Sequence, residues 1–392
     1  MNKRRHTRKK LILKNEKKSG HLNVQPVGKT ITSSLGSITT PGTSIDKYRL
    51  EVTKLPKLGN GLFGFAYAPD KLNFPVLVSF TTYYVEIFDE SMRCIHIHDC
   101  DELGYVAEGA IEVLIWTDDN QYTKTLVPEG NLWFIPKGAL HSLNNVGKEH
   151  AKLWVGFNST MPSNTDLGIV LNGLPTYLKQ KYAGSPHSLL KDYVGPNYNY
   201  YFNNYPKNEI NMKMSTNSIF SFDFSTIIPE FNDKNLGIIR TVNCKYWPLL
   251  KGANLSVSRI TMKPNTSTDY HWFSNADANY VIFKGEADIY MSIPNYNNDN
   301  DNNKLSVKAY EYAFVPAATP HSIRNTSKSN NLEIVVFLSS EDAKQVHLGN
   351  SLLFFGDSII QQSFVTRMGE EYPGTQGRVI ENVKNIGRII KL

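Results

Sequence analysis

The sequence predicts an all-β protein made of two copies of one barrel domain, each copy followed by a short helical segment. Short apolar runs such as 74–80, 110–116 and 132–135 are separated by Gly, Pro, Asn and Asp, a spacing typical of all-β barrels and sandwiches. The order of a β-rich block and a helical block then recurs, and the tripeptide at 166–168 has a counterpart at 347–349. The period of about 180 residues is too long for a solenoid repeat, so two copies of one domain fit best.

The composition is that of a globular chain with enough apolar residues for sizeable cores. Of the 392 residues, 41% are hydrophobic and 20% are charged, which excludes a wholly disordered chain. No apolar run reaches the roughly 18 residues that a transmembrane helix needs. The first thirty residues contain no apolar stretch of the kind found in secretory signals, so we expect a cytoplasmic protein. The three cysteines are too few for a disulfide framework and favour a reducing compartment.

The first segment along the chain, 1–45, is predicted to be a basic, disordered tail. Residues 1–18 contain nine Lys and Arg residues against one Glu. Because the whole chain carries +6 and this stretch carries +8, the remaining residues carry −2. Like charges repel one another and keep such a block unfolded. The alternative is a contact with an anionic surface, although no aromatic residue is interleaved there to stack on nucleic-acid bases.

Three further segments are expected after the tail. A first barrel domain spans 46–192, a linker rich in Tyr and Asn spans 193–218, and a second barrel domain with C-terminal helices spans 219–392. Within the two domains, helices are expected in 165–190 and in 346–366.

The first copy contains a pattern of candidate metal ligands. His96 and His98 lie two residues apart, so on a strand both side chains point to the same face. Glu102 follows in the pattern H-x-H-x3-E-x6-G, and His141 lies in a second segment that runs G-x5-P-x-G-x2-H-x3-N. A lone His-x-His pair is more often a core or surface pair, but here nine positions match without a gap. Three imidazole nitrogens and one carboxylate suit a borderline divalent metal.

These two segments resemble the two motifs of the cupin superfamily. With a second copy downstream, the chain is similar to bicupins, and most closely to the oxalate decarboxylase family, over roughly 60–365. The resemblance implies two tandem cupin barrels, which are double-stranded β-helices of the jelly-roll type. It also implies that Arg93, three residues before the first His, holds a substrate carboxylate. The run Leu-Trp-Phe-Ile-Pro at 132–136 agrees with the same family.

An arginine suits that role because its planar guanidinium group binds a carboxylate through two N–H groups. On a regular strand, however, Arg93 has the opposite parity to His96 and His98. Its side chain therefore enters the barrel only through a bulge or at a strand end. The alternative is a solvated arginine at the rim of the barrel.

The second copy lacks part of this pattern. His271 and His321 are retained, whereas Phe273 stands at the position of the second His, Ala278 at that of the Glu and Thr268 at that of the Arg. Two neutral ligands without an anionic one make a weak metal site. We therefore expect this copy to be structural, with Phe273 filling part of its cavity. The alternative is a residual site on the two histidines that recruits Asp277 or Asn275.

The lid of the first site departs from the family. The resemblance implies a segment Ser-Glu-Asn-Ser after the first barrel, whose Glu donates and accepts a proton, but the stretch 158–165 contains no acid. The nearest one, Asp166, lies at the start of the predicted helix and suits a helix N-terminus. Decarboxylation needs a proton at the carbon that loses CO2. Without a lid acid, oxidase chemistry becomes the alternative.

We therefore expect a metal-dependent bicupin that acts on a small carboxylate, either as an oxalate decarboxylase that forms formate and CO2 or as an oxidase that uses dioxygen. In this interpretation Arg93 and Glu102 are catalytic, and His96, His98, Glu102 and His141 bind Mn2+, with Fe, Zn or Ni also suited to the donor set. The alternatives are a metal-containing cupin that binds or senses a carboxylate without turnover, and a storage protein. The family also implies a homo-oligomer.

Overall fold

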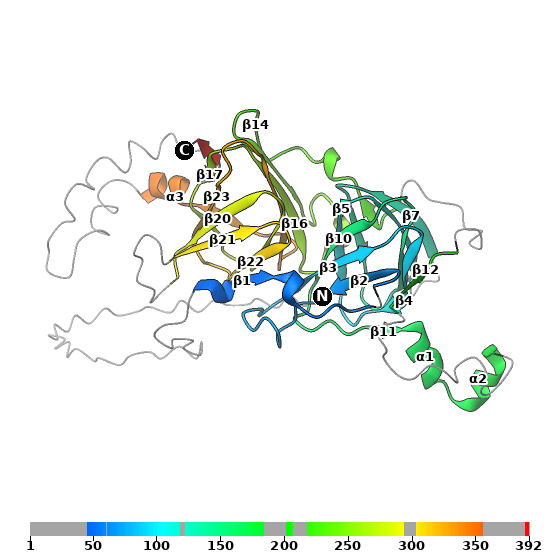
Figure 1. The fold of residues 1–392 in the computed structure, drawn as a ribbon. Helices are drawn as coiled ribbons and strands as arrows, with labels where there is room; N and C mark the ends of the chain where they lie inside the picture. The colour runs from blue at the N-terminus through cyan, green and yellow to red at the C-terminus, as the bar shows by residue number, and fades with distance from the viewer. Residues whose placement is uncertain are drawn as a thin grey trace, which may run out of the picture. The chain divides into compact units, whose positions relative to one another are not determined.

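The computed structural model describes residues 45–59, 61–117, 122–183, 201–206, 218–293, 303–355 and 389–391. The expected all-β architecture is confirmed, because two barrels of antiparallel strands make up the described chain (Figure 1). Apart from its last residue, the expected tail lies outside the described residues. None of the helices in the described part is long and apolar enough to cross a membrane.

The first barrel consists of two antiparallel sheets. Its strands are β2 (Gly64–Tyr67), β3 (Thr81–Ile87), β4 (Ser91–Ile97), β5 (Glu102–Glu108), β6 (Ala110–Trp116), β7 (Tyr122–Pro128), β8 (Leu132–Ile135), β9 (Leu140–Asn145), β10 (Ala151–Phe157), β11 (Thr165–Asp166), β12 (Phe202–Asn204) and β13 (Ser221–Phe222). One sheet has the order β13-β8-β5-β10-β3-β2, and the other has the order β11-β4-β9-β6-β7 with β12 beside β4. Apolar side chains from both sheets form one buried core, which includes Val85, Val113, Leu143 and Val155.

The second barrel repeats this arrangement. Its strands are β1 (Arg49–Glu51), β14 (Phe231–Asp233), β15 (Gly237–Val242), β16 (Ser256–Met262), β17 (Thr266–Thr268), β18 (His271–Phe273), β19 (Ala278–Lys284), β20 (Glu286–Met291), β21 (Lys304–Lys308), β22 (Glu311–Val315), β23 (His321–Asn325), β24 (Leu332–Leu338), β25 (Gln345–His347) and β26 (Ile389–Lys391). One sheet has the order β1-β22-β19-β24-β16-β15-β14, and the other contains β21-β20-β23-β17-β26 with β18 between β23 and β25. Short 3-10 helices span Ile45–Tyr48, Val52–Lys54, Phe224–Thr226 and Pro248–Leu250.

The glycine of the first motif has the same structural role in both copies. Gly109 and Gly285 have φ values of +81° and +91°, which an L side chain rarely adopts. A Cβ atom would lie 3.2 Å from the carbonyl oxygen of His150 at the first position and 3.0 Å from that of Asn331 at the second. In each copy the glycine lets the chain turn tightly against the neighbouring strand, which explains why the motif requires it.

Two edge strands cross the expected domain boundaries. β1 lies in the range expected for the first domain, yet it pairs with β22 of the second barrel. β13 lies in the range expected for the second domain, yet it pairs with β8 of the first barrel. The expected ranges 46–192 and 219–392 therefore differ from the barrels at the start of each range, because each half of the chain contributes a strand to the barrel of the other half. Strands of two or three residues carry no periodicity from which this could be predicted.

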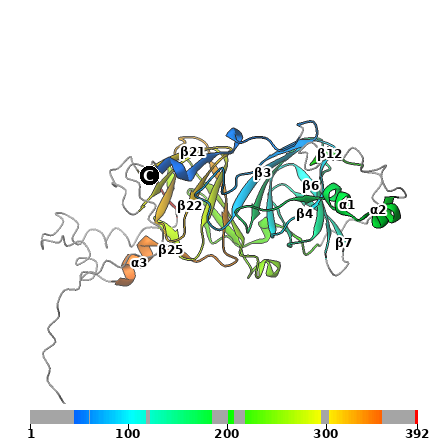
Figure 2. The same cartoon turned by 90° about the horizontal axis from the view of Figure 1, so that it is seen from below.

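The helical segments and the linker agree in part with expectation. α1 (Leu167–Gly173) and α2 (Thr176–Ala183) follow the first barrel and α3 (Leu348–Phe355) follows the second (Figure 2). The remainder of the helix expected up to residue 366 lies outside the described residues. Within the expected linker, 201–206 is described and includes β12, which pairs with β4 and buries Phe202. That part of the linker belongs to the first barrel.

The two barrels form one compact unit. A third apolar cluster lies between them and contains side chains from one sheet of each barrel. The rings of Phe74 and Tyr312 meet edge to face with centroids 5.5 Å apart, and Asn279 donates a hydrogen bond of 3.1 Å to Thr82. This interface fixes the back of the first barrel: β5, which begins with Glu102, lies in the interface sheet, and β4 and β9, which carry His96 and His141, lie in the opposite sheet.

Candidate metal centre

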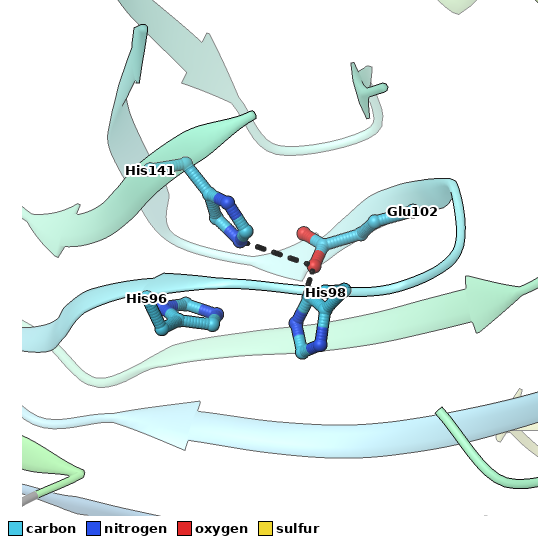
Figure 3. Close-up of side chains that lie close together, drawn as sticks. All are labelled: His96, His98, Glu102 and His141. Carbon is cyan, nitrogen blue, oxygen red and sulfur yellow. Dashed lines mark ion pairs between the residues drawn. The ribbon is translucent and has the colours of Figure 1, made fainter. Parts of the chain in front are cut away.

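The structure brings together all four side chains that the first copy of the motif singled out (Figure 3). His96 lies on β4, His98 directly follows it, Glu102 begins β5, and His141 lies on β9. One ligand atom from each residue lies within 4.8 Å of the others, and all four residues are buried. Within the described ranges, no other group of three or more His, Cys, Asp or Glu residues is arranged in this way.

Hydrogen bonds fix the orientation of the three imidazole rings. The Nδ1 atoms lie at hydrogen-bond distance from backbone carbonyl oxygens: 2.6 Å for His96 and Cys94, 2.6 Å for His98 and Ser163, and 2.9 Å for His141 and Ala139. A carbonyl oxygen only accepts, so each Nδ1 must carry the proton. Each Nε2 then keeps a lone pair. This is the tautomer in which histidine binds a metal through Nε2.

Glu102 is oriented in the same way by a buried tryptophan. The indole N–H group of Trp133 donates a hydrogen bond of 2.7 Å to Oε1. The other oxygen, Oε2, lies 3.4 Å from Nε2 of His98 and 3.5 Å from Nε2 of His141. The Nε2 atom of His141 is buried and has no hydrogen-bond partner in the described structure. A buried nitrogen lone pair beside a carboxylate oxygen fits a metal ion, so this donor set suits a divalent cation.

The ionisation states of the cluster agree with that fit. Burial raises the pKa of the Glu102 carboxyl, but the rings of His141 and His98 lower it by more, so its pKa lies well below the usual range. Burial lowers the pKa of His96, and the charge of Arg93 lowers it further, well below its ordinary value. At neutral pH Glu102 is therefore an anion and His96 is neutral, which are the states that bind a metal.

Arg93 enters the barrel through an irregularity in β4. The register between β4 and β9 shifts between Arg93 and His96, which overcomes the parity that opposed an inward arginine. Arg93 is 8% exposed and lines the cavity in front of the metal cluster. It is therefore not a solvated residue of the rim.

The cavity has a volume of about 370 Å3 and opens to solvent. This volume lies within the roughly 300–1,000 Å3 that is usual for small-molecule sites. Its polar wall includes His96, His98, Glu102 and Arg93. The rest of its wall is largely apolar, with side chains such as Leu58, Val85, Leu143, Val155, Phe157 and Phe202. Asp70 and Asn164 also line the cavity, so a small polar molecule would find hydrogen-bonding partners besides the metal cluster and Arg93.

Asp166 plays a part that the sequence did not indicate. It precedes α1 as the N-cap residue, but its side chain makes no capping hydrogen bond. Its Oδ1 instead accepts a hydrogen bond of 2.9 Å from Nη1 of Arg93, and its Oδ2 accepts one of 2.9 Å from Asn164. The expected role as a helix N-terminal residue is thus incomplete. The pairing of β11 with β4 places Asp166 opposite His96, and no sequence spacing predicts that contact.

The lid stretch without an acid lies against the cluster. The carbonyl oxygen of Ser163 accepts from Nδ1 of His98, and the backbone N–H of Ser163 donates to Asp99 over 2.9 Å. Pro162 and Asn164 line the cavity on this side. The stretch thus helps to position a candidate metal ligand, and it brings no carboxylate of its own to the cavity.

In the second barrel a tyrosine lies where a ligand would have to bind. The Tyr280 hydroxyl is 2.6 Å from Nε2 of His321 and 3.3 Å from Nε2 of His271. Phe273 lines the remaining space together with His271, and this cavity measures only about 60 Å3. The carboxylate of Asp277 is directed elsewhere, because it accepts from the backbone N–H of Ala317. These contacts agree with a structural role for the second copy.

The sequence is similar to a known protein family and to characterised relatives. A sequence model of the Cupin family matches residues 60–184 and 226–365. A probable oxalate decarboxylase from Arthroderma benhamiae is 22% identical over 275 residues, and the alignment covers 68% of this chain and 66% of that protein. The chain thus spans about two thirds of the length of this curated relative.

Two further comparisons concern the single domain and the fold. A germin-like protein (subfamily 2 member 2) from Arabidopsis thaliana is 30% identical over 143 residues, which cover 36% of this chain and 53% of that protein. Among solved structures, a deletion mutant of oxalate decarboxylase from Bacillus subtilis superimposes with a TM-score of 0.73 at 16% identity, covering 90% of both chains. The whole two-barrel arrangement is therefore similar to that of a solved oxalate decarboxylase.

Proposed function

The chain belongs to the cupin family, and from this premise we propose that it is a metal-dependent bicupin enzyme that acts on a small carboxylate with the chemistry of oxalate decarboxylases or oxidases. The observation that supports this most is the cluster of four buried donors with three Nε2 lone pairs and a carboxylate oxygen turned toward one another. Relatives named as oxalate decarboxylases and germin-like proteins support the same activity.

His96, His98, Glu102 and His141 would hold one divalent metal in the first barrel. Manganese is the first candidate by family resemblance, and iron, zinc and nickel also suit three imidazoles and a carboxylate. When bound, such a metal supplies Lewis acidity to a coordinated carboxylate and, if it is redox-active, a path for electrons to dioxygen. Trp133 and the backbone carbonyl groups that bind the Nδ1 atoms keep the four donors in place.

Arg93 would orient the substrate. It lines the same cavity as His96, His98 and Glu102, and a guanidinium group donates two parallel hydrogen bonds to a carboxylate or to neighbouring oxygens. The apolar side chains of the wall shield the substrate from part of the surrounding water, which strengthens these electrostatic contacts. Arg93 therefore holds the substrate in one orientation while its carbon–carbon bond is cleaved.

The fate of the proton distinguishes the two candidate reactions. Decarboxylation of hydrogen oxalate releases CO2 and places the proton on the remaining carbon as formate. Oxidation of oxalic acid instead passes two electrons and two protons to dioxygen, giving two CO2 and hydrogen peroxide. Residues 158–165 contain no acid to deliver a proton to carbon. This composition favours a contribution from the oxidase reaction.

The test is a product analysis of the manganese-loaded protein with oxalate. We expect CO2 together with formate, hydrogen peroxide or both, and their ratio reports the balance between the two reactions. An absence of turnover at full metal occupancy would contradict the proposed enzyme. If oxalate then binds in calorimetric titration and is recovered unchanged, the second candidate holds, a carboxylate-binding or sensing cupin.

A further inference from the structure

The guanidinium group that would anchor the substrate is already paired with a carboxylate of the protein. Asp166 accepts from Nη1 of Arg93 over 2.9 Å, and the two side chains are 7% and 10% exposed. Asn164 completes a ring, because its Oδ1 accepts from Nη2 of Arg93 while its Nδ2 donates to Asp166. A third acceptor, the carbonyl oxygen of Tyr201, lies 3.1 Å from Nη1. Arg93 is therefore held rigidly, and its positive charge is balanced before any ligand binds.

The remaining charges of the cavity do not replace that balanced cation. Among the described residues that line it, Arg93 is the only Lys or Arg, while Asp70 and Glu102 are acids. Glu102 would offset part of the charge of a divalent metal, and the metal would take the first carboxylate of a ligand. A second negative charge on the same ligand would then find no cation that is not already paired. Bringing such a charge into a partly buried cavity without a partner is unfavourable.

We propose that Asp166 is a specificity-determining residue that makes this site select singly charged carboxylic acids whose second polar group is neutral. Suitable ligands carry a hydroxyl, carbonyl, amide or protonated carboxyl group next to the carboxylate. Arg93 still lines the cavity and can donate a hydrogen bond to that neutral oxygen. The inference rests on the proposed function, since it takes the metal centre and Arg93 as the carboxylate site, and it narrows the substrate class.

The side chain of Asp166 would act through Arg93. Asp166 does not itself line the cavity in the described structure. It forgoes the capping hydrogen bond that an Asp at this position commonly makes, and its two oxygens bind Arg93 and Asn164 instead. The carboxylate is thus committed to the guanidinium group. Asp166 is therefore a positioning residue.

The test compares two ligands of nearly the same shape that differ by one charge. At pH 7 oxalate is a dianion and oxamate, its amide analogue, is a monoanion. Binding is measured by calorimetric titration of the zinc-loaded protein, since zinc has no redox chemistry that would consume the ligand. Wild-type protein is compared with Asp166→Asn, which keeps the shape of the side chain and removes its charge. The control Asp269→Asn changes an aspartate of similar burial in the second barrel, 8% exposed against 5% for Asp166.

The expected result is a change in the ratio of the two dissociation constants. Removing one negative charge favours a dianion twice as much in free energy as a monoanion, so when oxamate binding tightens about threefold, oxalate binding tightens about tenfold. Asp166→Glu, which keeps the charge, and Asp269→Asn should leave the ratio at its wild-type value. Circular dichroism verifies that each variant is folded, and Asp166→Ser replaces Asp166→Asn if the latter is not.

Two outcomes would overturn the inference. Only the second would also overturn the proposed function. If both ligands bind the wild-type protein but the charge-removing variant keeps the wild-type ratio, Asp166 does not determine specificity, and the proposed function stands. If neither ligand binds at full zinc occupancy, the cavity is not a carboxylate site. The proposed function then fails together with the inference.

Discussion

Substitution of Trp133 by phenylalanine tests whether the metal centre depends on the residues that orient its ligands. The indole N–H of Trp133 makes a 2.7 Å hydrogen bond to Oε1 of Glu102, and both residues are buried. Phenylalanine keeps most of the ring and removes this donor. The Glu102 carboxylate would then lose the contact that turns Oε2 toward His98 and His141. We therefore expect both weaker metal binding and a less stable first barrel.

The magnitudes follow from the kind of contact that is lost. Removing a hydrogen bond that orients a metal ligand usually lowers metal affinity by about 10- to 100-fold. A buried hydrogen bond to a charged group contributes about 1.5–3 kcal/mol to the free energy of unfolding. Because Trp133 is completely buried, solvent cannot replace the missing donor without entering the core. The expected loss therefore lies in the upper half of both ranges.

A second buried tryptophan provides the matched control. Trp154 lies on β10, is 1% exposed, and pairs with Tyr105, three residues along β5 from Glu102. Trp154→Phe removes the same atoms from the same barrel without touching the carboxylate. Manganese affinity is measured by competition with a chelator, and stability by urea unfolding of the metal-free protein. If Trp133→Phe weakens manganese binding no more than Trp154→Phe does, the ligand-orienting role assigned to Trp133 is wrong.

Three further predictions concern the two barrels. Glu102→Ala should lower manganese occupancy after dialysis, because it removes the anionic donor of the four-residue cluster. Unchanged occupancy in elemental analysis would show that the ligands are misassigned. Burial lowers the pKa of His321 from 6.5 to about 4. Because the unfolded chain takes up this proton more readily than the folded chain, the free energy of unfolding is highest above pH 6.5. It falls by about 3 kcal/mol as the pH drops toward 4. Urea unfolding at pH 7 and pH 4.5 should therefore show a smaller difference in the free energy of unfolding for His321→Gln than for wild type. An equal difference would contradict the lowered pKa of His321. Tyr280→Phe removes the hydroxyl between the two imidazoles of the second barrel but adds no anionic ligand. The stoichiometry should therefore stay at one metal per chain, and binding of a second equivalent would refute that reasoning.

Much of the first site could be predicted because its ligand residues lie at characteristic spacings in the sequence. His96 and His98 share a strand face whenever that segment is extended. The segments that contain Glu102 and His141 match the spacing of the two cupin motifs. The glycine at the end of the motif is required by its positive φ and by the backbone next to it. Two tandem barrels were predicted on the same basis, since the order of blocks and several motif positions recur.

The contacts that could not be predicted join residues that are far apart in sequence. Arg93 and Asp166 are separated by 73 positions, and only the pairing of two short strands brings them together. Tyr280 lies between the histidines of the second copy, although as a large aromatic residue on a strand it is typical of an ordinary core position. The exchange of β1 and β13 between the barrels likewise depends on tertiary pairing, which leaves no periodic signal in strands this short.

Anomalous diffraction from crystals grown with manganese directly tests whether the first barrel binds a metal. Data collected on either side of the manganese absorption edge locate the metal without any assumption about its ligands. We expect one anomalous peak per chain, within bonding distance of Nε2 of His96, His98 and His141 and of Oε2 of Glu102. We expect no peak between His271 and His321. A chain without a peak in the first barrel would contradict the proposal that these four residues bind a metal.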